Sequence, residues 1–257
     1  DWNGTETLTF TVDDSQGRAI ASDEVEIVVT PVNDAPVLSE VDPQITNDNT
    51  PTVITLEAED IDGDELIFSA ISEYPDNVAA GIIGNQLTLT PSEYFNGIVN
   101  VSVGVTDGEY TENTVFTLTV LPEEFEYSAT LFSGVFWGQS TIQNSPADSL
   151  DWVAAYDENG NCSGSGQLVH FENNLFMNLT IYGDDPGTID VDEGIDEEEI
   201  FYLVLWDASD NLFYHNDSLF ECWYNNNGAP MDGCGSTDQS YNFESHYTPE
   251  LTVIGDQ

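Results

Sequence analysis

Residues 93–108 read EYFNGIVNVSVGVTDG, with valine at every second position over 99–105. Apolar residues with a period of two are typical of a β-strand that buries one face. The stretch 1–14, DWNGTETLTFTVDD, repeats this pattern at an offset of 93 residues, and Gly4 stands in the place of Gly97. A repeat of roughly 90 residues built from such strands predicts consecutive β-sandwich units.

The same alternation runs through most of the chain and predicts further strands at 24–30, 54–58, 66–70, 87–89 and 116–120. After Pro122 the composition changes, because four of the five Trp, all three Cys and all three His lie in 123–257. Candidate strands in this part are 126–133, 151–156, 165–170, 174–182 and 199–206. The part from about residue 209 is rich in Asn and Gly and is predicted to be dominated by loops.

The predicted fold is therefore all-β: immunoglobulin-sized sandwiches in tandem, followed by a distinct C-terminal β-sandwich. The predicted domains are a partial unit at 1–32, a complete sandwich at 33–122 and the C-terminal sandwich at 123–257. The partial unit holds only the last strands of a repeat, and two strands alone are marginally stable in water. Three arrangements remain open: upstream residues in a longer chain, completion of a sandwich in another molecule by strand donation, or packing on the next domain.

The charge of the chain is extreme, because 49 Asp and Glu stand against a single strong base, Arg18, for a formal charge of -48. Nucleic acids, phosphate-bearing cofactors and anionic membranes are poor partners for such a surface, since their recognition needs Lys and Arg. Hydrophobic residues make up 40% of the sequence, enough for packed cores, but no apolar run approaches the ~20 residues of a membrane span. The self-repulsion calls for counterions, either from a high-salt medium or as divalent cations held by clustered carboxylates.

Carboxylates do cluster at predicted turns. The stretch AEDIDGDEL at 58–66 places three Asp at alternate positions around Gly63, which permits a tight turn. VNDAP at 32–36 supplies oxygen donors at the junction of two repeats, and VTDG at 105–108 ends a strand with another acid. The predicted Ca²⁺ site draws on Asn33, Asp34, Asp60, Asp62, Asp64 and Asp107. The alternative is ordinary turn chemistry, since Asp, Asn and Gly are common turn residues.

The half-repeat DWNGTETLTFTVDD, the junction VNDAPV and the turn DIDGDEL, in this order, resemble the cadherin-like tandem repeats of large bacterial surface proteins. The resemblance covers residues 1–122. It implies secreted Greek-key sandwiches strung end to end with calcium at the joints, and Asn33, Asp34, Asp60 and Asp62 as the main ligands. The junction PVNDAPV departs from the longer DxNDNAP motif of vertebrate cadherins, so fewer ligands come from the linker.

The C-terminal part resembles a β-domain of unknown function found near the C-terminal ends of secreted proteins in the Bacteroidota and related phyla. The resemblance rests on DWVAAYDENGNCSG, IYGDDPGTIDVDEG, YLVLWDAS and WYNNNGAPMDG, and implies an extracellular β-sandwich without an established activity. Nine acids between 184 and 199 predict either a solvated loop or a second divalent-cation site at Asp184, Asp185, Asp190 and Asp192. Asp157, Asn159 and Asn161 form another alternating oxygen pattern, without the Glu that completes an EF-hand.

The cysteines are odd in number, whereas a secreted chain usually pairs them. Cys222 and Cys234 lie 12 residues apart and are predicted to form a disulfide, which leaves Cys162 free or joined to another chain. The three His show no ligand spacing relative to the Cys, so a zinc site is not expected.

Surface glycans enter the prediction in two ways. Aromatic side chains of the C-terminal part could form a sugar-stacking face, for which Trp223 and Tyr224 are the best candidates, or they could simply pack in a core. Glycosylation is the second way, through Asn-x-Ser/Thr tripeptides and two Asp-Ser-Leu tripeptides, at Asn3, Asn100, Asn161, Asn178, Asn216, Ser149 and Ser218.

The sequence contains no Ser-His-Asp spacing, HExxH motif or phosphate loop, so we predict that the protein is not an enzyme. The predicted function is that of an extracellular structural or adhesive surface protein, a calcium-stabilised rod whose partners are upstream repeats or other copies of itself. In the filament version, the strands of 1–32 complete a sandwich in a neighbouring subunit. The alternative is a carbohydrate-binding module of a larger secreted protein.

Overall fold

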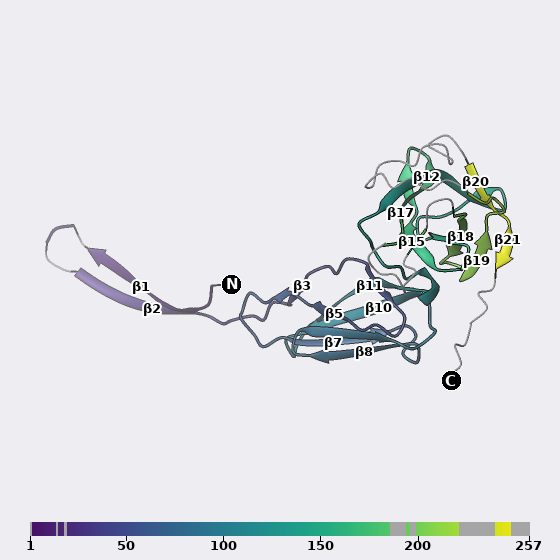
Figure 1. The fold of residues 1–257 in the computed structure, drawn as a ribbon. Helices are drawn as coiled ribbons and strands as arrows, with labels where there is room; N and C mark the ends of the chain where they lie inside the picture. The colour runs from purple at the N-terminus through teal and green to yellow at the C-terminus, as the bar shows by residue number, and fades with distance from the viewer. Residues whose placement is uncertain are drawn as a thin grey trace.

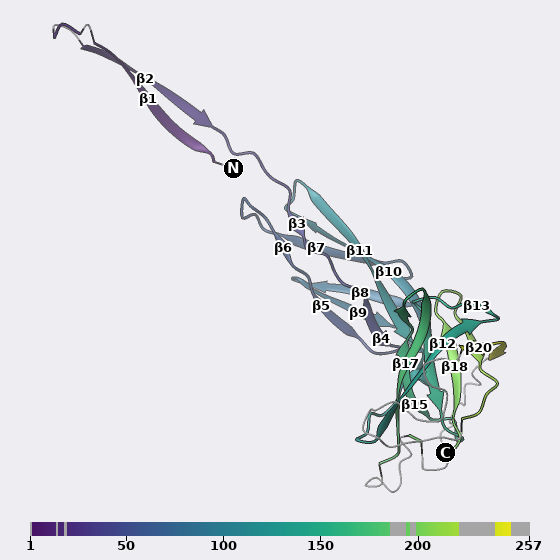
Figure 2. The same cartoon turned by 90° about the horizontal axis from the view of Figure 1, so that it is seen from above.

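The computed structural model describes residues 2–13, 15–17, 20–185, 194–195, 199–220 and 240–247. Within these residues the chain is built almost entirely from β-strands, with one short 3-10 turn at Glu123–Phe125 (η1). The prediction of an all-β fold is confirmed. Figures 1 and 2 show a hairpin and two sandwiches that follow one another along the chain.

The hairpin consists of β1 (Gly4–Asp13) and β2 (Ile20–Val29), paired antiparallel as a two-stranded sheet. It projects away from the rest of the molecule in both views (Figures 1 and 2). All its apolar side chains are exposed, so it does not pack on the next domain. This finding removes one of the three arrangements predicted for residues 1–32.

The first sandwich, residues 37–121, packs a four-stranded sheet on a three-stranded sheet. The larger sheet has the order β4–β11–β10–β7, with β4 (Gln44–Asn47), β7 (Ile67–Ser72), β10 (Gly97–Thr106) and β11 (Thr111–Leu121). The smaller sheet has the order β5–β9–β8, with β5 (Thr52–Thr55), β8 (Val78–Ile83) and β9 (Gln86–Pro91), while β3 (Val37–Leu38) pairs with β6 (Ala58–Glu59).

The core of the first sandwich follows from the alternation in its sequence. The valines of β10 that stand at every second position are at most 1% exposed, and they meet Leu87 and Leu89 of the facing sheet, which are fully buried. The pairing of β10 with β11 and β7 is antiparallel, but β11 pairs with β4 in parallel.

The second sandwich, residues 133–247, contains two five-stranded sheets within the described residues. One runs β13–β12–β17–β16 with β20 beside β12, from β12 (Ser133–Ile142), β13 (Ser145–Pro146), β16 (Val169–Phe171), β17 (Asn174–Tyr182) and β20 (Ser240–Phe243). The other runs β15–β14–β18–β19–β21, from β14 (Trp152–Tyr156), β15 (Cys162–Gln167), β18 (Tyr202–Asp207), β19 (Leu212–His215) and β21 (Ser245–Tyr247). Phe136, Phe201 and Phe220 form the aromatic centre of its core.

One expected strand of the C-terminal part is wrong. The strand predicted at 126–133 is absent, because β12 begins only at Ser133 and the chain before it is irregular. Among the described residues after 209, β19, β20 and β21 add short strands to both sheets. The prediction that loops dominate this part stays a prediction, because residues 221–239 and 248–257 lie outside the described chain. β20 and β21 pair with β12 and β19, which lie far from them in the sequence, whereas β19 forms a local hairpin with β18.

The segment between the two sandwiches is anchored on both sides. Phe125, 2% exposed, meets the rings of Tyr156, Trp206 and Phe213 edge-on, in a cluster that also contains Leu121 at the end of β11. The hydroxyl of Tyr156 donates to the carbonyl of Glu124 at 2.8 Å. This packing makes the connection between the sandwiches part of a hydrophobic core instead of a free linker.

Candidate metal centre

The turn after β6 gathers three carboxylates. Oδ1 of Asp60 accepts the backbone N–H groups of Asp62, Gly63 and Asp64 at 2.9, 3.0 and 3.3 Å. Gly63 has φ of +79°, a conformation that glycine adopts without strain. The turn therefore forms because one aspartate oxygen satisfies three consecutive amides.

The same turn brings carboxylate oxygens together. One oxygen from each of Asp60, Asp62 and Asp64 lies within 4.8 Å of the others. Asp60 is half-buried, and its second oxygen, Oδ2, is inaccessible to solvent and has no hydrogen-bond partner. An ionised oxygen in this condition is costly unless a cation coordinates it.

The linker from the hairpin joins this turn. The backbone N–H of Asp34 donates to Oδ2 of Asp62 at 2.8 Å, and Nδ2 of Asn33 donates to Oδ2 of Asp107 at 2.8 Å. The backbone N–H of Tyr110, with that of Glu109 and the Asn33 amide, holds the pKa of Asp107 below its ordinary value against the opposing effect of burial. The structure therefore places all six predicted ligands at one end of the first sandwich, and Asp107 keeps its negative charge there.

Two further residues at this end of the sandwich were not predicted from the sequence. Trp2, together with Asp34 and Asp62, lines a cavity of about 180 Å³ between the end of the hairpin and the sandwich. Oε2 of Glu112 accepts the backbone N–H of Leu38 at 3.0 Å and so fixes the start of β3 beside β11. Trp2 belongs to the repeated stretch at 1–14, but only the folded chain brings Trp2 and Glu112 to this end of the sandwich.

Comparisons with known proteins fit this architecture. Residues 33–120 match the family model described as a bacterial Ig domain. This segment is a bacterial Ig-like domain. No curated protein matches the chain.

Solved structures show only distant likeness. An endo-fucoidan hydrolase from glycoside hydrolase family 107 has 16% sequence identity and a TM-score of 0.29, over 81% of this chain and 32% of that chain. An I-band fragment of titin has 7% identity and a TM-score of 0.29, over 83% and 66%. A fragment of human protocadherin-24 has 11% identity and a TM-score of 0.31, over 83% and 100%. This chain spans about a third of the length of the fucoidan hydrolases, and at these TM-scores none of the similarities informs function.

The second predicted cation site is only partly described. Asp184 and Asp185 follow β17, whereas Asp190 and Asp192 lie outside the described residues. The Asp157 pattern forms a turn: Oδ1 of the fully buried Asp157 accepts the backbone N–H groups of Asn159 and Asn161, and Oδ2 accepts Nδ2 of Asn161. Since N–H groups satisfy both oxygens of Asp157, this turn needs no cation.

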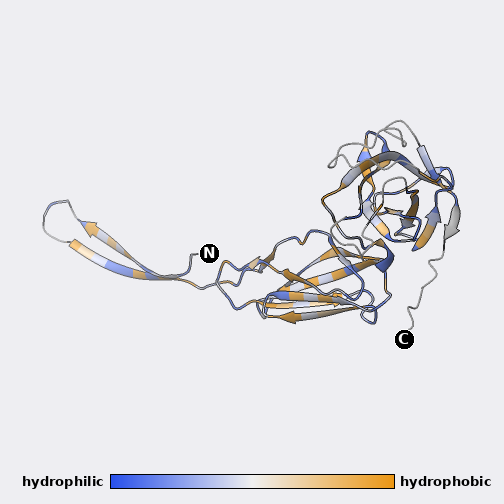
Figure 3. Ribbon diagram, viewed as in Figure 1, coloured by the Kyte–Doolittle hydropathy of each residue, from blue (hydrophilic) through white to orange (hydrophobic). Residues whose placement is uncertain are grey.

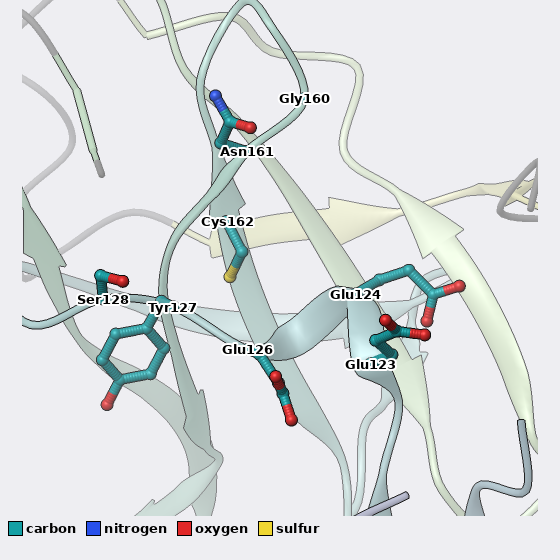
Figure 4. A pocket seen from close by; sticks show the side chains of 8 residues that line it. All are labelled: Glu123, Glu124, Glu126, Tyr127, Ser128, Gly160, Asn161 and Cys162. Carbon is teal, nitrogen blue, oxygen red and sulfur yellow. The ribbon is translucent and has the colours of Figure 1, made fainter. Parts of the chain in front are cut away.

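A second acidic cavity, of about 380 Å³, lies where the Ig-like domain meets the second sandwich (Figure 4). Its walls come from the segment after β11, from the turn before β15 and from the first residue of β15. The lining residues are Glu123, Glu124, Glu126, Tyr127, Ser128, Gly160, Asn161 and Cys162. Burial raises the pKa of the Cys162 thiol to about 12, so the thiol stays protonated. Cys162 forms no disulfide with any described residue, and the predicted partners Cys222 and Cys234 lie outside the described chain.

The predicted sugar-stacking face finds little support in the described aromatic residues. Trp152 and Trp206 are buried in the second sandwich. Trp137 stacks on Phe176 with the ring centroids 5.3 Å apart, so one of its faces is covered. Trp223 and Tyr224 lie outside the described residues, and their proposed contact with glycans stays a prediction.

The predicted glycosylation positions differ in exposure. Asn3, Asn100, Asn161, Asn178, Ser149 and Ser218 are exposed. The structure argues against a glycan at Asn216, because this residue is 6% exposed and its Nδ2 donates to the carbonyl of Asn242 at 2.8 Å. A glycan there would have to break the contact between the segment after β19 and β20.

Proposed function

We propose that this chain is a section of an extracellular structural or adhesive rod, in which Ca²⁺ binds between residues 1–32 and the Ig-like domain. Bacterial Ig domains are typical of surface and extracellular proteins and are typically non-catalytic. No helix in the described part of the chain is long and apolar enough to span a membrane. The partners in this proposal are neighbouring repeats rather than nucleic acid or lipid.

The observation that carries the calcium proposal is the unpartnered Oδ2 of Asp60. Leaving a buried polar atom unsatisfied costs about 1–3 kcal/mol, and more when it is charged. A hard cation that takes six to eight oxygen ligands suits a set rich in carboxylates, and Ca²⁺ tolerates irregular geometry. Asp60, Asp62 and Asp64 of the turn and Asn33 and Asp34 of the linker would hold the ion, with Asp107 fixing Asn33.

The proposed role of the ion is mechanical. It would neutralise part of the repulsion in a chain of charge -48 and tie the linker to the turn, which stiffens the joint. Binding to the folded form alone also stabilises it, by about 2.7 kcal/mol at a Ca²⁺ concentration of 100 times the dissociation constant.

Isothermal titration calorimetry of the full chain with CaCl₂ tests this proposal. Asp60→Asn removes the central carboxylate, and Asp76→Asn, in the exposed turn between β7 and β8, removes the same charge elsewhere. We expect a saturable Ca²⁺ site that Asp60→Asn weakens at least about tenfold and Asp76→Asn leaves unchanged. Equal Ca²⁺ affinity in both variants would indicate that the three aspartates only form a turn and do not bind the ion.

A further inference from the structure

The hairpin reproduces the geometry of the last two strands of the Ig-like domain. Gly4 and Gly97 have φ of +140° and +141°, and each opens a strand. Gly4 pairs with Val29 as Gly97 pairs with Val120, and each pairing continues over the following nine positions without a shift. A Cβ at Gly4 would lie 3.8 Å from the ring of Trp2, and a Cβ at Gly97 would lie 3.7 Å from the ring of Phe95. The aromatic ring two positions earlier therefore covers the glycine in both places.

The two hairpins share an apolar pattern, which Figure 3 shows for β1–β2 as orange segments among blue ones, but they differ in what covers them. They also differ on the inward face, where Glu6 takes the position of the fully buried Val99. One face of β1–β2 carries six apolar side chains with exposed fractions between 37% and 72%, namely Leu8, Phe10, Val12, Val25, Ile27 and Val29. The register assigns to these positions the residues Val101, Val103, Val105, Phe116, Leu118 and Val120 of β10–β11. Those residues are at most 4% exposed. The other face of β1–β2 is rich in Thr and Glu, as expected for a solvent-facing side.

The Ig-like domain shows which elements cover such a face. The sheet β5–β9–β8 lies over it with Val78, Leu87 and Leu89, all fully buried. The flanking strands β7 and β4 pair with β10 and β11. Asp48, which follows β4, also holds the chain before β10, since its Oδ2 accepts the backbone N–H of Tyr94 at 2.8 Å. Polypeptide that buries the apolar face of β1–β2 would therefore need the same strands as residues 37–93, which bury the matching face of β10–β11.

We propose that β1–β2 closes an Ig-like unit whose remaining strands are supplied by polypeptide preceding residue 1 in the same chain. This inference deepens the rod proposal, on which it rests, by naming the partner of the hairpin.

A second copy of the described chain has no Ig-like domain that lacks its last two strands and could accept β1–β2. The place for a closing hairpin in its Ig-like domain is filled by β10–β11, whose inward residues are fully buried or nearly so. β11 also continues into Leu121 and Phe125, which are packed in the core shared with the second sandwich. A donated hairpin would have to displace strands that are covalently attached and anchored at their end, so strand donation between copies is disfavoured.

The chain provides its own test. In the test protein, a second copy of residues 33–93 is joined directly before Asp1 of the full chain. Because the repeat offset is 93 residues, Asp1 then follows residue 93 of the copy just as Tyr94 follows it in the Ig-like domain, and the copy supplies the strands that β1–β2 lacks. We expect hydrogen exchange at the amides of Leu8, Phe10 and Ile27 to slow by at least about 100-fold in the extended protein. The control is the same extension with Asp at the two added positions that copy Leu87 and Leu89, which should restore fast exchange.

Two results would overturn the proposal. One is fast exchange of the hairpin in the extended protein. The other is a 257-residue chain that forms oligomers in which the hairpin is already protected, which would identify a second copy as the partner. Exchange is measured with calcium and with EGTA, and sedimentation reports the oligomeric state. If the chain binds no calcium but this inference is correct, the hairpin of the extended protein is still protected from exchange in EGTA. Failure of the proposed calcium joint and failure of this inference are therefore distinguishable.

Discussion

Replacing Phe125 tests whether the segment between the sandwiches is a rigid anchor. Its side chain is 2% exposed, and its ring lies 6.5, 6.4 and 6.1 Å from the rings of Tyr156, Trp206 and Phe213, all edge-on. A buried Phe→Ala change costs about 3–5 kcal/mol, of which each edge contact contributes about 0.5–1.5 kcal/mol beyond the area it buries. Phe125→Ala should therefore destabilise the second sandwich by about 4 kcal/mol.

The matched control is Phe171→Ala. Phe171 also meets two aromatic rings edge-on, those of Trp137 and Phe176, but its side chain is 54% exposed. Its loss should cost less than about 1 kcal/mol, because little apolar area returns to water. Urea denaturation followed by Trp fluorescence measures both changes, since Trp206 lies in the affected cluster. Equal effects of the two substitutions would refute the anchoring role of Phe125.

Three further predictions concern single residues. Burial raises the pKa of Asp151 to about 7, so between pH 4 and 7 the folded form binds a proton that the unfolded form has lost. The free energy of unfolding should therefore fall as pH rises through this window, by up to about 1 kcal/mol per pH unit. Asp151→Asn should remove this part of the pH dependence, as measured by urea denaturation at pH 4.5–7.5. Cys162 is half-buried in a cavity wall, and its thiol, with a pKa of about 12, should react slowly with iodoacetamide at pH 8 in the folded protein and faster in urea, as mass spectrometry would show. Rapid labelling of Cys162 in the folded protein would contradict the raised pKa. Gly97→Ala should lower the stability of the Ig-like domain by about 1–3 kcal/mol, because alanine is strained at the φ of +141° that Gly97 adopts. Gly81→Ala is the control and should cost less, because Gly81 has no positive φ. Similar melting temperatures of the two variants would argue against strain at position 97.

The long alternating strands were predictable because their pattern is local. The valines of β10 and the repeated stretch in β1 give both the strands and the buried face directly from sequence. Short strands were not predictable, because long-range pairing defines them. β3 has two residues and pairs only with β6, and β4 becomes a strand through a parallel pairing with β11, more than 60 residues away.

The acidic turn illustrates the same limit. The spacing of Asp60, Asp62 and Asp64 in one turn was enough to predict that they converge. The sequence offered both Asp107 and Asn33 as candidate ligands, but their hydrogen bond joins residues 74 positions apart and was not predictable from it. The repeat matches Trp2 to Phe95, but its place beside Asp34 and Asp62 was not predictable, because it depends on how the hairpin leaves the sandwich.

That position of Trp2 provides the most direct measurement of the central claim, that a calcium ion binds at the joint. Tb³⁺ is a luminescent substitute for Ca²⁺ and is excited by energy transfer from a nearby Trp, here Trp2 in the cavity lined by Asp34 and Asp62. We predict Tb³⁺ emission that is lost when Ca²⁺ displaces the Tb³⁺ ion. Asp60→Asn should abolish this emission and Trp2→Phe should strongly reduce it, while Asp76→Asn should have no effect. Emission that is equal in all these variants, or that Ca²⁺ does not displace, would contradict a calcium joint between the hairpin and the Ig-like domain.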